Sequence, residues 1–167
     1  MVWINIKIDD LETIQKALNL LTTVNCTANL KVVKQDYLEY ILRKITKDPH
    51  IFLYEDNIFQ ILLIFLDVLP EKEEIELVKC AIKWDFNNES INPLDVLNIM
   101  AKKTREFMIQ KGNKKIWMEP YKYNDIPFAH ILEWYNDTII SVYLNHKIKV
   151  TKIEKEELLR WEFEVIK

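Results

Sequence analysis

The sequence predicts an α+β protein in which a helical N-terminal block, about residues 9–111, packs on a C-terminal antiparallel β-meander, about residues 115–166. Apolar residues before Gly112 recur mostly at helical spacing, whereas the segments after it alternate at the period of a strand. Gly112 is the only glycine and separates the two patterns. With 167 residues, 49% of them hydrophobic, and no linker-like stretch, the chain is expected to form a single domain over residues 1–167.

The first half reads as one strand followed by helices. Val2–Ile8 alternates apolar and polar residues, which predicts a strand that is a candidate to join the C-terminal sheet. Residues 11–21 and 35–46 place apolar side chains at helical spacing. Ile58–Leu66 is apolar on nearly every side, which predicts a helix at the centre of the block. It is too short to span a membrane, because a span needs about 20 residues.

Two further helices are expected before Gly112. Glu71–Trp84 has acidic residues in its first turn and lysines toward its end, as the helix dipole favours. The next helix begins with Asn92 as N-cap and Pro93 at its first position. It runs to Lys111 and ends at Gly112, where a left-handed C-terminal cap is common.

The segments after Gly112 are predicted as strands from their alternation and their β-branched content. Asn136–Asp137 and Asn145–His146 are candidate hairpin turns between them. Residues 127–137 also fit helical spacing, so the sequence leaves helix and strand open there. The predicted strands are Ile116–Tyr123, Thr138–Leu144, Lys147–Ile153 and Leu158–Ile166.

The single glycine argues against chemistry that depends on glycine-rich loops. A Walker A loop, a dinucleotide-binding fingerprint and a nucleophile elbow all need glycine for close backbone approach or a strained turn. The abundance of isoleucine and lysine indicates that part of this depletion reflects an AT-rich coding sequence. No metal-ligand spacing is present, and we expect neither a metal nor a cofactor.

Few residues offer catalytic chemistry. The only histidines are His50, His130 and His146, and none belongs to a recognised motif. Cys26 and Cys80 are expected to be reduced, buried thiols of a cytoplasmic protein, since no signal peptide opens the sequence. A cleft that collects His130, Glu133 and a cysteine would support an enzyme whose site is scattered in sequence. The sequence itself identifies no catalytic residue and favours a protein that is not an enzyme.

Charge is unevenly distributed and suggests a binding function. Residues 48–95 carry eleven acidic residues against three lysines, a net charge of −8. We therefore expect a small protein that binds another protein stoichiometrically, such as an immunity protein or a phage-encoded inhibitor that masks the basic surface of a toxin or nucleic-acid enzyme. A solvated helix surface explains the same charges. The candidate partner-binding residues are Asp67, Glu71, Glu73, Glu74, Glu76, Trp84 and Asp85.

The alternative hypothesis is a nucleic-acid-binding or nuclease-like protein. Residues 102–124 carry seven basic residues against two acidic ones, a net charge of +5, and aromatic residues lie among them. Lysines could bind phosphates and aromatic rings could stack on bases, although the basic end of a helix explains the same pattern. The candidate residues are Lys102, Lys103, Arg105, Lys111, Lys114, Lys115, Trp117 and Lys122.

Overall fold

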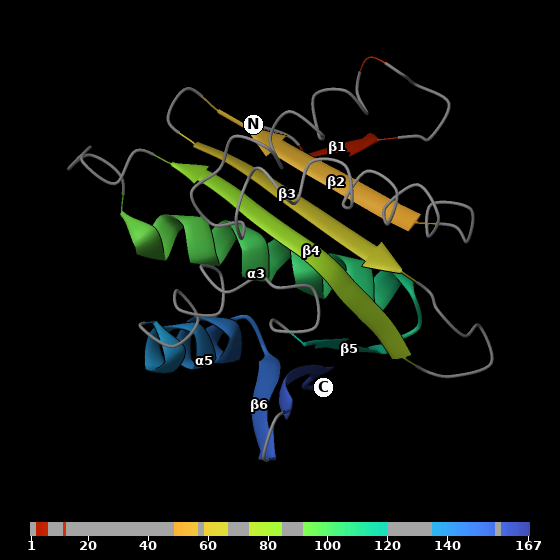
Figure 1. The fold of residues 1–167 in the computed structure, drawn as a ribbon, viewed down its shortest axis with the longest axis vertical. Helices are drawn as coiled ribbons and strands as arrows, with labels where there is room; N and C mark the ends of the chain where they lie inside the picture. Colours follow the sequence, from red (N-terminus) through yellow and green to blue (C-terminus); the bar gives the residue numbers. More distant parts are fainter. Residues whose placement is uncertain are drawn as a thin grey trace.

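A computed structural model describes residues 3–6, 12, 49–56, 59–66, 74–84, 92–119, 135–155 and 158–167. These residues form a seven-stranded sheet in the order β1-β2-β3-β4-β5-β7-β6, with two helices against one face (Figure 1). The elements are β1 Trp3–Ile6, β2 Pro49–Glu55, β3 Phe59–Leu66, β4 Glu74–Trp84, α3 Pro93–Gln110, β5 Lys115–Met118, α5 Asn136–Asn145, β6 Ile148–Lys155 and β7 Leu158–Val165.

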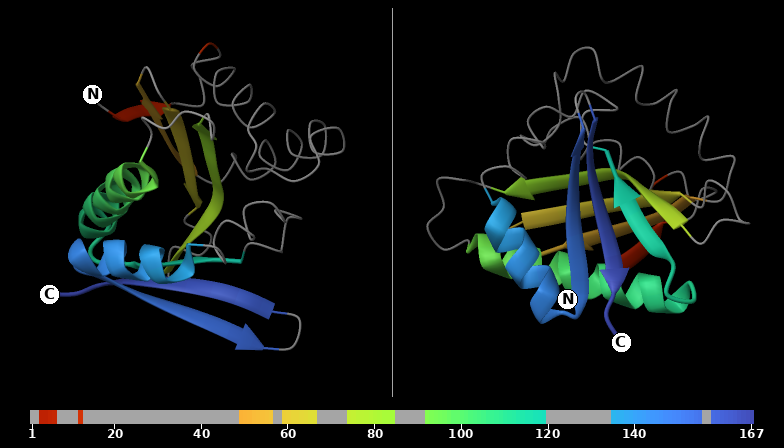
Figure 2. Two further views of the ribbon diagram at one scale, coloured as in Figure 1. Left: turned by 90° about the vertical axis from the view of Figure 1, so that its left-hand side faces the viewer. Right: turned by 90° about the horizontal axis from the view of Figure 1, so that it is seen from below.

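The sheet consists of two antiparallel groups joined by one parallel pair. Strands β1 to β4 are antiparallel neighbours, and so are β5, β7 and β6. Only β4 and β5 run parallel, and α3 makes the crossover that a parallel connection requires. Figure 2 shows that β6 and β7 run across the direction of β2, β3 and β4, and that α5 lies between α3 and this C-terminal ribbon.

The predicted central helix at Ile58–Leu66 is wrong, because this segment forms strand β3. Seven of the eight β3 residues are buried, so side chains on both faces of the strand are covered. A strand buried on both faces carries a continuous apolar run without alternation, as a buried helix does. Periodicity therefore could not distinguish the two structures.

The helix predicted over Glu71–Trp84 is also wrong, because Glu74–Trp84 forms strand β4. Its apolar residues alternate at Ile75 and Leu77 and again at Cys80 and Ile82, with one extra residue between the two runs. That extra residue shifts the alternation and produces a spacing that resembles a helix. The fold class is thus corrected: the described chain is mainly a mixed sheet, and not a helical block packed on a meander.

The helix before Gly112 is confirmed as α3. The Asn92 side chain accepts a hydrogen bond from the backbone N–H of Leu94 at 3.0 Å, and Pro93 occupies the first helical position. Lys111 is the C-terminal cap, and Gly112 follows with φ of +76°. Glycine adopts this left-handed conformation at no steric cost.

The C-terminal predictions have mixed outcomes. Strands β5, β6 and β7 lie within predicted strands or within one residue or two of them. The strand predicted at Thr138–Leu144 is wrong, because Asn136–Asn145 forms α5. Its buried residues Ile139, Val142 and Tyr143 follow helical spacing. The two predicted hairpin turns are instead the start of α5 and its C-terminal cap at His146.

The N-terminal strand does join the sheet, but at the edge opposite to the C-terminal strands. Trp3 pairs with Tyr54 of β2, so β1 and β6 form the two edges. The helices predicted at 35–46 and, apart from residue 12, at 11–21 lie outside the described residues. So do Cys26 and the undecided segment 127–134.

The core between α3 and the first four strands centres on aromatic rings. Phe107 of α3 stacks on Phe65 of β3 at 4.6 Å between ring centroids and meets Phe52 of β2 edge to face at 5.4 Å. The His50 ring lies 5.0 Å from the same phenylalanine. Phe107 is 2% exposed, so its ring is one of the buried side chains that fix α3 to the sheet.

Replacing Phe107 with alanine should lower the free energy of unfolding by about 3–5 kcal/mol, because the removed ring leaves a cavity between α3 and the sheet. Urea unfolding of the purified variant measures this loss. Ile109→Ala is the matched control, since Ile109 lies on the same helix and is 46% exposed. Its cost should stay near about 0.5 kcal/mol. Equal losses in the two variants would contradict this description of the core.

Candidate functional site

The sheet opens between β4 and β5. The two strands pair only at Glu74–Lys115, Ile75–Ile116 and Glu76–Trp117. β4 then continues from Leu77 to Trp84 with β3 on one side, and no described strand pairs with its other side. A strand side that no described strand occupies can present backbone N–H and C=O groups, so this stretch is a candidate to bind a ligand.

A β-bulge explains why β4 separates from β5. Ile64 of β3 faces Lys79, but the next residue, Phe65, faces Leu77, so Val78 is an extra residue in β4. An extra residue bends a strand, increases its twist and leaves its own backbone groups outside the regular ladder. Val78 lies two residues after Glu76, the last β4 residue that pairs with β5. The bend and the opening therefore occur at the same point.

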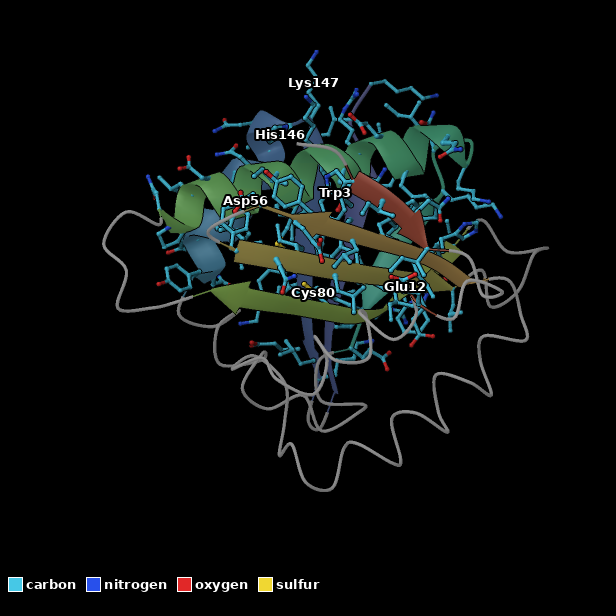
Figure 3. All side chains as sticks on the ribbon, turned by 90° about the horizontal axis from the view of Figure 1, so that it is seen from above. Trp3, Glu12, Asp56, Cys80, His146 and Lys147 are labelled. Carbon is cyan, nitrogen blue, oxygen red and sulfur yellow. The ribbon has the colours of Figure 1, made fainter. Side chains whose placement is uncertain are left out.

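Tyr143 of α5 connects the two sides of this opening. Its ring lies 5.3 Å from the ring of Phe163, which is paired with Ile116 of β5. Its hydroxyl is hydrogen-bonded to Thr104 of α3 and lies within electrostatic reach of Cys80 on β4. Figure 3 shows Cys80 among the central strands. The tyrosine thus extends from the β5–β7 side of the sheet toward the unpaired part of β4.

The surroundings of Tyr143 keep its hydroxyl protonated. Burial raises the pKa of Tyr143 far above its usual value, the charge of the nearby Cys80 raises it further, and the hydrogen bond with Thr104 lowers it in part. Thr104 also donates its hydroxyl proton to the carbonyl oxygen of Met100 at 2.8 Å, which fixes the threonine side chain beside the tyrosine. The hydroxyl is therefore a proton donor at neutral pH and not a base.

A second buried donor lies near the same place. Trp161 of β7 pairs with Met118, the last residue of β5. Met118 lies one residue beyond Trp117, the last β5 residue that pairs with β4. The side chain is fully buried, and its indole N–H has no hydrogen-bond acceptor among the described residues. Buried donors are rarely left without an acceptor, so this N–H is a candidate to bind a ligand oxygen.

The opposite face of β4, β5 and β7 carries a network of charged side chains. The Lys115 ammonium lies 2.7 Å from Glu162 and 3.5 Å from Glu164, and the hydrogen bond with Glu162 raises the pKa of this lysine. The Arg160 guanidinium lies over the Trp117 ring at 4.3 Å and 3.8 Å from carboxylate oxygens of Glu74 and Glu119. These contacts hold β5 between its neighbours where the parallel pair is closed.

A hollow of about 710 Å³ lies at that closed end. It is lined by residues at the start of β4 and β5 and at the end of β7, among them Glu74, Lys115 and Glu164. Ligands of parallel strands bind outside the carboxyl ends of the strands, and this hollow lies at the amino ends. The opening beside Val78, and not the hollow, is therefore the candidate site.

Only three of the seven residues predicted to bind a partner lie within the described residues. Glu74 lies 3.8 Å from Arg160, and Glu76 is 2% exposed and thus unavailable to a partner. Trp84 is the last residue of β4. The remaining members of the set, Asp67, Glu71, Glu73 and Asp85, lie outside the described residues.

The basic residues predicted to bind nucleic acid are divided among different surroundings. Lys103 lies over the ring of Phe52 at 4.3 Å, and Lys111 lies 6.0 Å from the ring of Phe107. Lys115 belongs to the charged network on the opposite face together with Trp117. Lys102 is exposed, Arg105 and Lys114 are half-buried, and Lys122 lies outside the described residues.

The remaining candidates give no catalytic cluster. His146 bonds to the Asn98 side chain at 2.8 Å, and Figure 3 shows it beyond α3 from Cys80. His130 and Glu133 lie outside the described residues, so the predicted cleft is not tested. In the described ranges, no group of three or more histidine, cysteine or acidic side chains could hold a metal. Neither described helix combines the length and apolar character that crossing a bilayer requires.

Sequence reasoning missed Val78 and Tyr143. The phase shift in the alternation of β4 was the available signal for a bulge at Val78. The helical spacing of Ile139, Val142 and Tyr143 was the signal for α5, and the β-branched content of the segment outweighed it. No local pattern indicates that these two residues meet at one opening.

Comparison with known proteins identifies the fold. No protein family model and no curated protein sequence matches this chain. A mutant of the spermidine N-acetyltransferase SpeG from Vibrio cholerae superposes with a TM-score of 0.51 and 12% identity, over 99% of this chain and 95% of that one. The chain therefore shares the overall fold of that enzyme.

Two other solved structures align with lower scores. A chimera of that Vibrio cholerae enzyme with hSSAT gives a TM-score of 0.49 at 14% identity, over 99% of this chain and 96% of that one. The NatC complex bound to Gag peptide and CoA gives 0.44 at 14% identity, over 99% of this chain and 98% of the matched chain.

The likeness corrects the functional hypothesis drawn from charge. The fold shared with that enzyme contradicts the expected inhibitor or immunity protein without a cofactor, and the nucleic-acid-binding alternative with it. The physical reason is that charge counted along the sequence does not predict charge on a surface. Lys115 of the basic block pairs with Glu162, and Glu74 of the acidic block pairs with Arg160, so each contacts a residue of opposite charge that lies outside both blocks.

The raised pKa of Tyr143 should make stability depend on pH in alkali. Above pH about 10 the unfolded chain loses the tyrosine proton while the folded chain keeps it, so stability falls by about 1.4 kcal/mol per pH unit through this group. Tyr143→Phe should lack this component, whereas Tyr135→Phe, on the same helix, should follow the wild type. Urea unfolding at pH 9, 10 and 11 measures the slopes. Parallel curves for the wild type and Tyr143→Phe would contradict the burial of the hydroxyl.

Proposed function

We propose that this protein is an enzyme that transfers an acyl group, such as acetyl, from a thioester to an amine. One arrangement carries the proposal: a bulged strand that separates from its parallel neighbour, with a buried tyrosine hydroxyl extending toward its unpaired side. The likeness of the fold to a spermidine N-acetyltransferase supports the same reaction class. Fold and function are separable, so the argument depends on what this opening can do chemically.

The side of β4 that no described strand occupies suits the acyl end of a thioester. The carbonyl oxygen becomes negatively charged when an amine attacks, and backbone N–H groups aimed at it stabilise that charge. The bulge at Val78 leaves backbone groups outside the ladder with β3 at the point where β5 departs. The indole N–H of Trp161 is a further donor without an acceptor among the described residues.

The reaction balances with one proton donor. The amine first releases its ammonium proton to solvent, and the lone pair of the neutral nitrogen then attacks the carbonyl carbon. The C–N bond forms, and the C–S bond breaks with its electron pair on sulfur. The Tyr143 hydroxyl gives its proton to the leaving thiolate, and the surplus proton of the nitrogen returns to the tyrosine oxygen. The products are an amide and a thiol. The raised pKa of Tyr143 suits it to this role, because the hydroxyl stays protonated until the thiolate forms.

The fold likeness suggests which acceptors to test first. The solved structure that superposes with a TM-score of 0.51 is a spermidine N-acetyltransferase. Primary amines, with spermidine as one example, are therefore the first acceptors to test.

Purified protein should acetylate at least one member of an amine panel. The panel contains spermidine, short peptides with free N-termini and simple alkylamines, each with acetyl-CoA or the smaller donor S-acetyl-N-acetylcysteamine. Thiol release and the mass of the amide measure turnover. No transfer from either donor to any amine would contradict the proposed function.

Tyr143→Phe should lower kcat about 100-fold or more while KM for the amine changes little, because only proton donation to the leaving group is lost. The matched control is Tyr135→Phe, at the N-cap of the same helix, which should retain wild-type kcat. Circular dichroism and urea unfolding show that both variants are folded. Equal kcat in the two variants would exclude Tyr143 as the donor.

A further inference from the structure

The N-terminus of α3 lies where this sheet would hold a phosphorylated donor. α3 follows β4 and begins at the end of the sheet to which β4 points (Figure 1). Phosphate-bearing ligands of parallel strands bind outside the carboxyl ends of the strands, on the free N–H groups of the helix that follows. Coenzyme A, a general carrier of acyl groups, would bring its diphosphate to this helix end.

The first turn of α3 has no N–H group available for a phosphate. Pro93, at the first position, has no N–H. The N–H of Leu94 is bonded to the side-chain oxygen of Asn92 at 3.0 Å, and the N–H of Asp95 is bonded to the Asn92 carbonyl at 3.0 Å. All three donors that could have met an anion are absent or occupied.

Charge near this helix end also opposes an anion. Asp95 places an exposed carboxylate in the first turn, where it interacts favourably with the positive end of the helix dipole in place of a ligand. The sequence between β4 and Asn92, residues 85–91, contains Asp85 and Glu89 and no lysine, arginine or glycine. It therefore supplies neither a basic side chain for a phosphate nor a glycine that would let the backbone approach it.

We propose that this chain recognises its acyl donor without a diphosphate contact at α3, through the thioester and the neutral amide-bearing arm beside it. This inference rests on the proposed function and specifies its donor. An extended amide chain can pair with the side of β4 that no described strand occupies, as an added strand does. Acetyl-pantetheine, which keeps that arm and lacks the nucleotide, should then serve as well as acetyl-CoA.

Two measurements test the inference. With one amine, kcat/KM for acetyl-CoA and for acetyl-pantetheine should agree within about threefold, because a lost phosphate contact would be worth tenfold for each 1.4 kcal/mol. Independently of turnover, calorimetry should detect binding of pantetheine and none of adenosine 3′,5′-bisphosphate. A preference for acetyl-CoA above about 30-fold, or binding of the bisphosphate, overturns the inference.

A variant that reopens the helix end sharpens the test. Asn92→Gly frees the Leu94 N–H, and Asp95→Asn removes the carboxylate. The double variant should gain at least about threefold in its preference for acetyl-CoA over acetyl-pantetheine, as one new phosphate contact would give. Asp137→Asn removes the corresponding acidic residue in the first turn of α5 and should leave the ratio unchanged. An unchanged ratio in the double variant would show that the closed first turn does not set donor choice.

The outcomes separate the inference from the proposed function. If acetyl-CoA is a donor and acetyl-pantetheine is not, the enzyme activity stands and only the inference fails. If neither thioester acetylates any amine, the proposed function fails and the inference that depends on it fails as well. Transfer from both donors at similar efficiency supports both.

Discussion

The position of the bulge at Val78 is the constraint on which the rest of the site depends. β4 must pair with β3 along its length to complete the buried core, yet it pairs with β5 at three residues only. One extra residue resolves this conflict, because the added bend and twist carry β4 away from β5 while the ladder with β3 resumes beyond it. The unpaired side of β4 follows from that single irregularity.

The pair formed by β4 and β5 is closed by ion pairs at one end and open at the other. At the closed end, Lys115 and Arg160 bind carboxylates of neighbouring strands and fix β5 in the sheet. At the open end no described strand replaces β5, and Tyr143 extends toward the gap from α5 with its hydroxyl buried. A sheet that is tightly joined at one end and separated at the other can keep its fold while presenting backbone groups to a ligand.

The sequence predicted elements well where a local signal was unambiguous. The cap at Asn92, the proline at position 93 and the glycine after Lys111 define α3 from both ends, and each acts through its own backbone. Strand β7 was predicted from plain alternation. The predictions at β3 and β4 were wrong, because neither strand keeps the alternation of apolar and polar residues that marks a strand. β3 is an apolar run buried on both faces, and a bulge interrupts β4. The prediction was also wrong at α5, where β-branched residues outweighed the spacing of the buried ones.

By itself, the sequence determined that glycine-loop chemistry is absent and that the N-terminus of α3 is capped by its own residues. Both conclusions follow from covalent properties of single residues: glycine alone tolerates the strained loop conformations, and proline has no N–H. Only the tertiary structure decided which strand edge stays open, which charges neutralise one another, and that Tyr143 extends toward β4. Those features join residues that are distant in sequence, such as Cys80 and Tyr143, and their contact depends on strand register and helix packing. Local patterns carry no information about either.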